Sequence, residues 1–164
     1  MAEHNISVAN TLVVLLTEKK YATVRDILIT MNPADIAWIF DEVEQERLPI
    51  LFRLLPKELA AEAFVEMEPE AQELLIHSFS DNELREVLDE LYVDDAVDIV
   101  EEMPANVVRR ILAQADPQMR KDINMILRYP ENSAGSIMTT EYVNNRRNTT
   151  DKSGQHLPGS AISE

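Results

Sequence analysis

The chain has 164 residues, a formal net charge of −15 at pH 7 and no cysteine. This length fits one domain with a core of its own, and the lack of cysteine excludes a disulfide framework and a thiolate metal site. The excess of acidic groups would repel the phosphates of nucleic acids and anionic lipids, so it disfavours nucleic-acid binding and favours cations or basic partners.

Residues 1–31 are predicted to form a helical hairpin. Apolar residues follow helical spacing over residues 6–20 and again over residues 24–31. The most apolar run, residues 12–16, is far shorter than the roughly 20 residues that cross a bilayer, and the N-terminus lacks the basic region and cleavage site of a signal peptide. We therefore expect a soluble chain, without direct membrane insertion, in which this hairpin caps a larger helical body.

Residues 32–130 carry helix-start signals that recur about every 24 residues, a period in the range of helical-repeat arrays. Proline is favoured at the first position of a helix, where its missing amide would be unpaired in any case, and Ser80 with Glu83 matches a capping box. Two interleaved series of starts are present: Asn32-Pro33, Leu55-Pro56, Ser80-Asp81 and Met103-Pro104, and between them Glu68-Pro69, Val93-Asp94 and Asp116-Pro117.

Between these starts, apolar residues repeat at the i, i+3, i+4, i+7 spacing of amphipathic helices. Each helix would have about three turns, too few for stability alone, so neighbouring helices must bury its apolar face. No glycine occurs before Gly135, which fits an all-helical body with short turns. The sequence therefore predicts an all-α fold: a right-handed superhelix of short helix pairs of the armadillo or HEAT type, with the hand taken from such arrays in general. Pro49 is the one irregularity and is tolerable only in the first turn of its helix.

The acidic charge is concentrated on this repeat. Residues 32–130 hold 23 acidic and 9 basic residues, whereas the segments on either side are balanced or nearly so. The sequence has no phosphate-binding glycine loop, no nucleophile elbow and no His-Glu-x-x-His zinc motif. His77 is interpreted as a helix residue and not as a catalytic base. We therefore predict that the chain is not an enzyme.

Carboxylates are the remaining candidates for a site, and the best placed are Asp94 and Asp98. They are four residues apart and share one helix face, with Asp95 nearby, and Glu62 in an earlier repeat can face the same side. Magnesium takes oxygen ligands, often only one or two carboxylates, and keeps several waters. The pattern thus fits a weak, hydrated magnesium site. The competing interpretation is structural, because acids in a first helical turn favour the helix dipole and acidic faces are usually only solvated.

Residues 127–143, Leu-Arg-Tyr-Pro-Glu-Asn-Ser-Ala-Gly-Ser-Ile-Met-Thr-Thr-Glu-Tyr-Val, resemble a specific junction in MgtE-type magnesium transporters. In that family the cytosolic helical N domain is followed there by the first CBS domain. Residues 94–104, with Asp-Asp-Ala-Val-Asp followed by Glu-Glu-Met-Pro, resemble the N domain itself. The resemblance covers about residues 6–143. It assigns residues 131–143 to a junction that resembles the start of a CBS domain.

The resemblance implies a regulatory role. In the family, magnesium bound between the acidic N and CBS domains brings them together and favours a closed pore, and loss of magnesium lets like charges part them. Asp94 and Asp98, with Asp95 nearby, are most like the family's N-domain ligands, and their counterparts would come from a CBS domain. The implied partners are the CBS and transmembrane domains of a homodimeric transporter, on the cytoplasmic side of the plasma membrane.

The sequence departs from the family after Val143. Residues 144–164 are rich in Asn, Thr, Ser and Gly and lack apolar periodicity, so we expect a disordered tail. Without a CBS core or transmembrane helices, the chain alone is not expected to transport ions. Two alternatives stay open: a protein-interaction scaffold similar to the middle domain of flagellar motor switch proteins, and an acidic solenoid with no metal role.

Overall fold

A computed structural model describes residues 2–128, with side-chain burial from residue 6 onward. The predicted junction over residues 131–143 and the predicted tail over residues 144–164 lie outside the described residues. Within residues 2–128 the structure contains ten α-helices and no strand. In chain order they are α1 (Ala2–Thr17), α2 (Tyr21–Leu28), α3 (Pro33–Glu42), α4 (Leu48–Arg53), α5 (Lys57–Val65), α6 (Pro69–Ser78), α7 (Asp81–Glu90), α8 (Val93–Glu102), α9 (Ala105–Gln114) and α10 (Pro117–Ile126).

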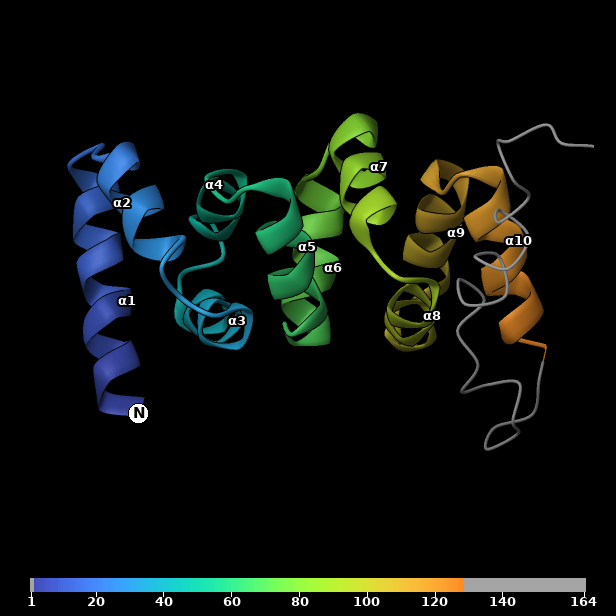
Figure 1. The fold of residues 1–164 in the computed structure, drawn as a ribbon, viewed down its shortest axis with the longest axis horizontal. Helices are drawn as coiled ribbons and strands as arrows, with labels where there is room; N and C mark the ends of the chain where they lie inside the picture. The colour runs from blue at the N-terminus through green and yellow to red at the C-terminus, as the bar shows by residue number, and fades with distance from the viewer. Residues whose placement is uncertain (1, 129–164) are drawn as a thin grey trace, which may run out of the picture.

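The helices stack into an array that runs from α1 at one end to α10 at the other (Figure 1). α1, α3, α5, α7 and α9 pack in succession, each against the next, and form one layer. In the second layer α4 packs against α6 and α8 against α10, while α6 also contacts α9. The predicted all-α superhelix of short helix pairs is confirmed, and its right-handed sense stays a prediction. Among the described helices, none is long and apolar enough to cross a membrane.

Local capping signals explain where the helices begin. The Asn32 and Asp116 side chains accept backbone hydrogen bonds at the starts of α3 and α10. Ser80 and Glu83 form the predicted capping box at the start of α7, which confirms that motif. Pro49 lies in the first turn of α4, where the amide that it lacks would have no helical partner. Short local signals therefore determine the residues at which these helices of the array begin.

Four predicted helix starts differ from the structure. That of α8 lies one residue earlier than predicted, with Tyr92 as the N-cap and Val93 as the first helical residue. Pro56 and Pro104 are the N-cap residues of α5 and α9, one position before the first helical residue. Both have ψ near 150°, and because the proline ring fixes only φ, it suits an N-cap as well as a first helical turn. α1 begins at Ala2 and not at Ile6, because the prediction relied on apolar spacing that starts only at Ile6.

One hydrophobic core runs through the array and includes a cluster of three phenylalanine rings. Phe52 comes from α4, Phe64 from α5 and Phe79 from the residue that ends α6. Their ring centroids are between 5.2 and 6.4 Å apart, and all three side chains are buried. Aromatic pairs at such separations contribute stability beyond the area that they bury. The cluster therefore joins three successive helices.

Two arginines hold the junction between α6 and α7 from neighbouring helices, and the first is Arg53 of α4. Its Nε donates to a carboxylate oxygen of Glu83 at 2.7 Å, and its Nη2 donates to the carbonyl oxygen of Ser78 at 3.2 Å. The hydrogen bond from Arg53, aided by one from the backbone amide of Ser80, lowers the pKa of Glu83 to about 2. Glu83 is therefore ionised over the whole physiological range.

Arg110 of α9 reaches the same junction. Its guanidinium donates to the carbonyl oxygens of Ile76 and Phe79 at the C-terminal end of α6. It also lies 3.5 Å from a carboxylate oxygen of Asp81 at the start of α7. The last carbonyl groups of a helix have no partner within that helix. Arg110 therefore supplies donors that α6 lacks and fastens α9 to it.

Candidate cation-binding site

A cleft of about 310 Å³ lies where α5, the end of α7 and the start of α8 meet. All charged residues that line it are acidic: Glu62 from α5, Glu66 from the C-cap of α5, Glu90 from α7 and Asp95 from α8. A concave surface with charges of one sign focuses the electric field and raises the local concentration of counter-ions. This acidic cleft, as we call it, is therefore a concave surface suited to attract a cation.

Asp95 shows the effect of that charge most clearly. It is half-buried in the first turn of α8, and burial is the main cause that raises its pKa. The negative charges of Asp94, Asp98 and Glu66 raise the pKa of Asp95 further. Because these surroundings disfavour the carboxylate, a cation bound beside it would favour that form and lower the pKa.

The structure brings together only some of the predicted site residues. Glu62 and Asp95 line the acidic cleft, whereas Asp94 and Asp98 are exposed on α8 and act on Asp95 through their charges. Within the described part of the chain, no group of three or more histidine, cysteine or acidic side chains is placed to hold a metal ion. Of the four predicted residues, the acidic cleft therefore unites Glu62 and Asp95.

Two acidic residues of the cleft, Glu66 and Glu90, are absent from the predicted set. Glu66 lies four residues after Glu62, so helical spacing would have found it once Glu62 was chosen. Glu90 reaches the cleft because α7 packs against α5. No local pattern in the sequence shows that contact.

A second acidic cleft, of about 250 Å³, is lined by residues of α3 and α6 together with the segments beside them. Asp41, Glu68 and Glu70 are its acidic residues. Burial raises the pKa of Asp41, and the negative charges of Glu68 and Glu70 act in the same direction, while a hydrogen bond from the Glu68 backbone opposes them. The aromatic residue that lines this second cleft, Phe40, is only 1% exposed. Both clefts are thus lined by acidic residues, but they differ in the apolar surface that they offer.

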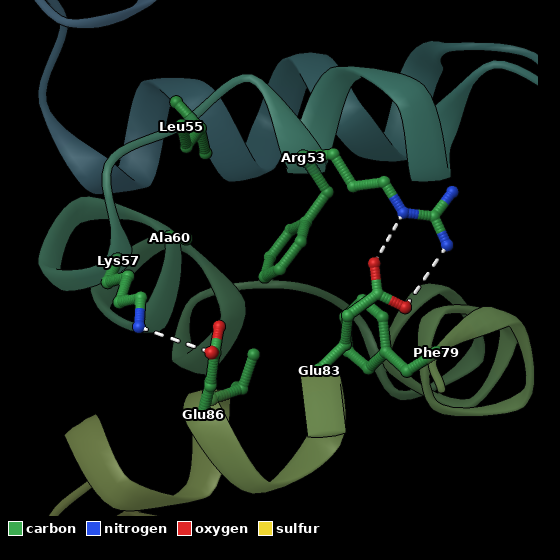
Figure 2. Close-up of a pocket in the computed structure, with 9 residues that line it drawn as sticks. Arg53, Leu55, Lys57, Ala60, Phe79, Glu83 and Glu86 are labelled. Atoms are coloured by element: carbon green, nitrogen blue, oxygen red, sulfur yellow. Dashed lines mark hydrogen bonds and ion pairs between the residues drawn. The ribbon is translucent and has the colours of Figure 1, made fainter. Parts of the chain in front are cut away.

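A third cleft, of about 400 Å³, opens between α4, α5 and α7 (Figure 2). Its rim carries two ion pairs, Arg53 with Glu83 at 2.7 Å and Lys57 with Glu86 at 3.3 Å. Rings of the phenylalanine cluster form part of its lining. Because the charges of its rim compensate each other, this cleft has no preference for an ion of either sign.

Asp95→Asn is expected to raise the free energy of unfolding by about 0.5 kcal/mol without divalent cations, because it removes a half-buried charge together with the like-charge repulsion around it. These two costs are expected to exceed the lost interaction with the helix dipole. This gain in the free energy of unfolding is expected at neutral pH, where Asp95 of the unchanged chain is ionised. As the pH falls through the raised folded pKa of Asp95 toward the unfolded value of 3.8, protonation relieves the same repulsion in the unchanged chain. Urea unfolding at about pH 7 and about pH 4 measures the free energy of unfolding of the variant and of the unchanged chain. The two values should converge at the lower pH.

The matched control for this prediction is Asp94→Asn. Asp94 lies in the same helical turn but is exposed. Its loss is expected to change the free energy of unfolding by less than about 0.3 kcal/mol, with the lost interaction with the helix dipole opposing the relieved repulsion. An equal gain for both variants would contradict the special position of Asp95.

The family described as the MgtE intracellular N domain matches residues 31–132. Among curated proteins, the magnesium transporter MgtE of Thermus thermophilus is 33% identical over 139 residues, and that of Bacillus subtilis is 24% identical over 132 residues. These matches cover 82% and 80% of this chain, but only 31% and 29% of the two transporters. The chain thus spans about three tenths of their length.

Two solved structures are also similar. The cytosolic domain of the Mg²⁺ channel MgtE in complex with ATP superposes with a TM-score of 0.70 at 32% identity, over 81% of this chain and 55% of that one. The soluble part of a magnesium transporter gives a TM-score of 0.72 at 19% identity, over 84% of this chain and 54% of that one. The second likeness bears on the fold alone.

Proposed function

Because the chain belongs to the family of the MgtE intracellular N domain, we propose that it is the magnesium-sensing regulatory domain of an MgtE-type magnesium transporter. The observation that carries this proposal is the acidic cleft, where Glu62 and Asp95 lie with Glu66 and Glu90. Magnesium takes oxygen ligands, often from only one or two carboxylates, and keeps several of its waters. An open acidic surface suits such an ion. The proposed role is regulatory and includes no catalysis.

In this proposal the acidic cleft is one half of a shared site, and the facing half is an acidic surface of a CBS domain in the full-length transporter. A magnesium ion between the two surfaces offsets the repulsion between their carboxylates and stabilises the docked state. When the ion leaves, the repulsion separates the domains. An ion that binds one conformation preferentially shifts the population toward it, so docking would follow the cytosolic magnesium concentration.

The remaining parts of the proposal concern the whole transporter. Transmembrane domains of a homodimer would carry the ions, and this domain would lie on the cytoplasmic side of the plasma membrane. Docking on the CBS domains would gate their uptake. Because the isolated chain supplies only its own half of the carboxylates, its affinity for magnesium should be in the millimolar range or weaker.

Magnesium added to the 164-residue chain is expected to shift the backbone amide resonances of Glu62, Asp94, Asp95 and Asp98, with saturation in the millimolar range. A two-dimensional ¹H–¹⁵N NMR titration measures these shifts. Magnesium is also expected to lower the pKa of Asp95, because a nearby cation favours the carboxylate. The carboxyl carbon resonance, followed against pH with and without magnesium, reports that pKa.

A titration with potassium chloride at matched ionic strength is the control, since general screening acts on all exposed charges alike. The double variant Glu62→Gln with Asp95→Asn should lose most of the magnesium-specific shifts. If Asp41 and Glu68 in the second cleft respond to magnesium while the amides of Glu62 and Asp95 stay still, the proposed site is wrong.

A further inference from the structure

Tyr92 is the most exposed large hydrophobic residue in the described part of the chain, with 64% of its surface open to solvent. It is the N-cap residue of α8 and lines the acidic cleft together with the apolar residues Pro33, Val65 and Leu91. A tyrosine in this position offers a large, rigid contact surface. The cleft therefore combines an aromatic and apolar wall with carboxylates.

A hydrated magnesium ion does not bind to an aromatic and apolar surface, because it binds oxygen atoms and keeps much of its water. Arginine has the complementary chemistry. Its guanidinium is planar and weakly hydrated, stacks on aromatic rings and pairs with two carboxylate oxygens at once. Its aliphatic stem can cover apolar surface while the charged end stays near water.

We propose that the acidic cleft binds an arginine side chain of a basic polypeptide segment, with the guanidinium against the Tyr92 ring and facing the cleft's carboxylates. The excess of acidic residues on the repeat, 23 against 9 basic ones over residues 32–130, attracts such a segment from a distance. This inference does not rest on the magnesium-sensing role. Because both ligands use the same carboxylates, magnesium and the basic segment compete for the cleft.

The second acidic cleft, around Asp41, provides a comparison within the same molecule. It carries Glu68 and Glu70 as well, so it attracts cations in a similar way. Its ring, Phe40, is buried and cannot stack on a ligand. Net charge alone would direct arginine to both clefts, whereas the aromatic wall directs it to the one at Tyr92.

The experiment uses three small probes on the ¹⁵N-labelled 164-residue chain: the N-acetyl amides of arginine, of lysine and of citrulline, the uncharged analogue of arginine. We expect the arginine probe to shift the amides of Leu91, Tyr92 and Asp95, the lysine probe to bind more weakly, and the citrulline probe to leave them unchanged. Tyr92→Ala should weaken arginine binding about two- to fivefold, the ratio that a cation–π contact at an exposed site supplies, and Tyr92→Phe should preserve it. Added magnesium should displace the probe.

Two results would overturn the inference. One is an equal response of the Tyr92 cleft to the arginine and lysine probes, which Tyr92→Ala leaves unchanged. The other is an equal response of the Asp41 cleft and the Tyr92 cleft to the arginine probe. The magnesium titration of Tyr92→Ala separates this inference from the proposed function, since that variant keeps every carboxylate. If magnesium shifts nothing in either form while arginine still selects the Tyr92 cleft, the magnesium role fails and the arginine site stands.

Discussion

Replacement of Phe64 by alanine is expected to lower the free energy of unfolding by about 3 to 5 kcal/mol, the range for truncation of a buried phenylalanine. Phe64 is 2% exposed and contacts the rings of Phe52 and Phe79, at centroid distances of 6.0 and 6.4 Å. The loss would therefore combine a cavity in the core with two broken aromatic contacts. Urea unfolding followed by circular dichroism measures the change.

Two variants control for this effect. Phe64→Leu keeps much of the side-chain volume, so it should cost less than about 2 kcal/mol. Tyr21→Ala removes an aromatic ring that is 42% exposed and should cost less than about 0.5 kcal/mol. A loss below about 1 kcal/mol for Phe64→Ala would mean that the phenylalanine cluster does not join the helices as described.

Replacement of Arg110 by alanine is expected to lower the free energy of unfolding by about 2 to 3 kcal/mol, because hydrogen bonds to a charged donor are worth about that much. The side chain is 27% exposed and bridges α9 to the carbonyl groups of Ile76 and Phe79. Without it, those carbonyls and Asp81 lose their donor at a packed junction. Chemical unfolding of the variant and the unchanged chain gives the difference.

Arg109 is the matched control, since it is the preceding residue of α9, is exposed, and makes no hydrogen bond or ion pair within the described residues. Arg109→Ala should change the free energy of unfolding by less than about 0.5 kcal/mol. Arg110→Lys keeps the charge but not the planar fork that reaches two carbonyls, so it should recover less than half of the loss. Equal effects of Arg109→Ala and Arg110→Ala would show that only net charge matters.

The helices could be predicted from the sequence because their start signals are local. Asn32, Ser80 and Asp116 cap helices by accepting hydrogen bonds from amides two or three residues on, so spacing alone identifies them. Pro56 and Pro104, the N-cap residues of α5 and α9, left the predicted helix starts uncertain by one residue. The fixed φ of proline is compatible with both the N-cap and the first helical position. The packing of alternate helices into one layer follows only from the three-dimensional structure.

The candidate site was only partly predictable. Helical spacing and the resemblance to the MgtE N domain selected Asp94 and Asp98, with Asp95 beside them, and Glu62 was added from its position in an earlier repeat. The structure lines one cleft with Glu62 and Asp95 and leaves Asp94 and Asp98 outside its lining. The contribution of Glu90 depends on how α7 packs against α5, and that of Tyr92 on where the turn between α7 and α8 lies. The exposure of a tyrosine is a property of the folded surface. The sequence shows which residues carry charge but not which concave surface they share.

The bridge made by Arg110 also determines how the array can be divided. In a repeat protein whose units touch only their immediate neighbours, the last pair can be removed while the rest stays folded. Here α9 supplies donors to α6, which precedes it by three helices, and α6 contacts α9 directly. Deletion of α9 and α10 would uncap α6 and unpair Asp81 at the start of α7. We therefore expect the segment from α6 to α10 to unfold as one cooperative unit and not as a series of interchangeable modules.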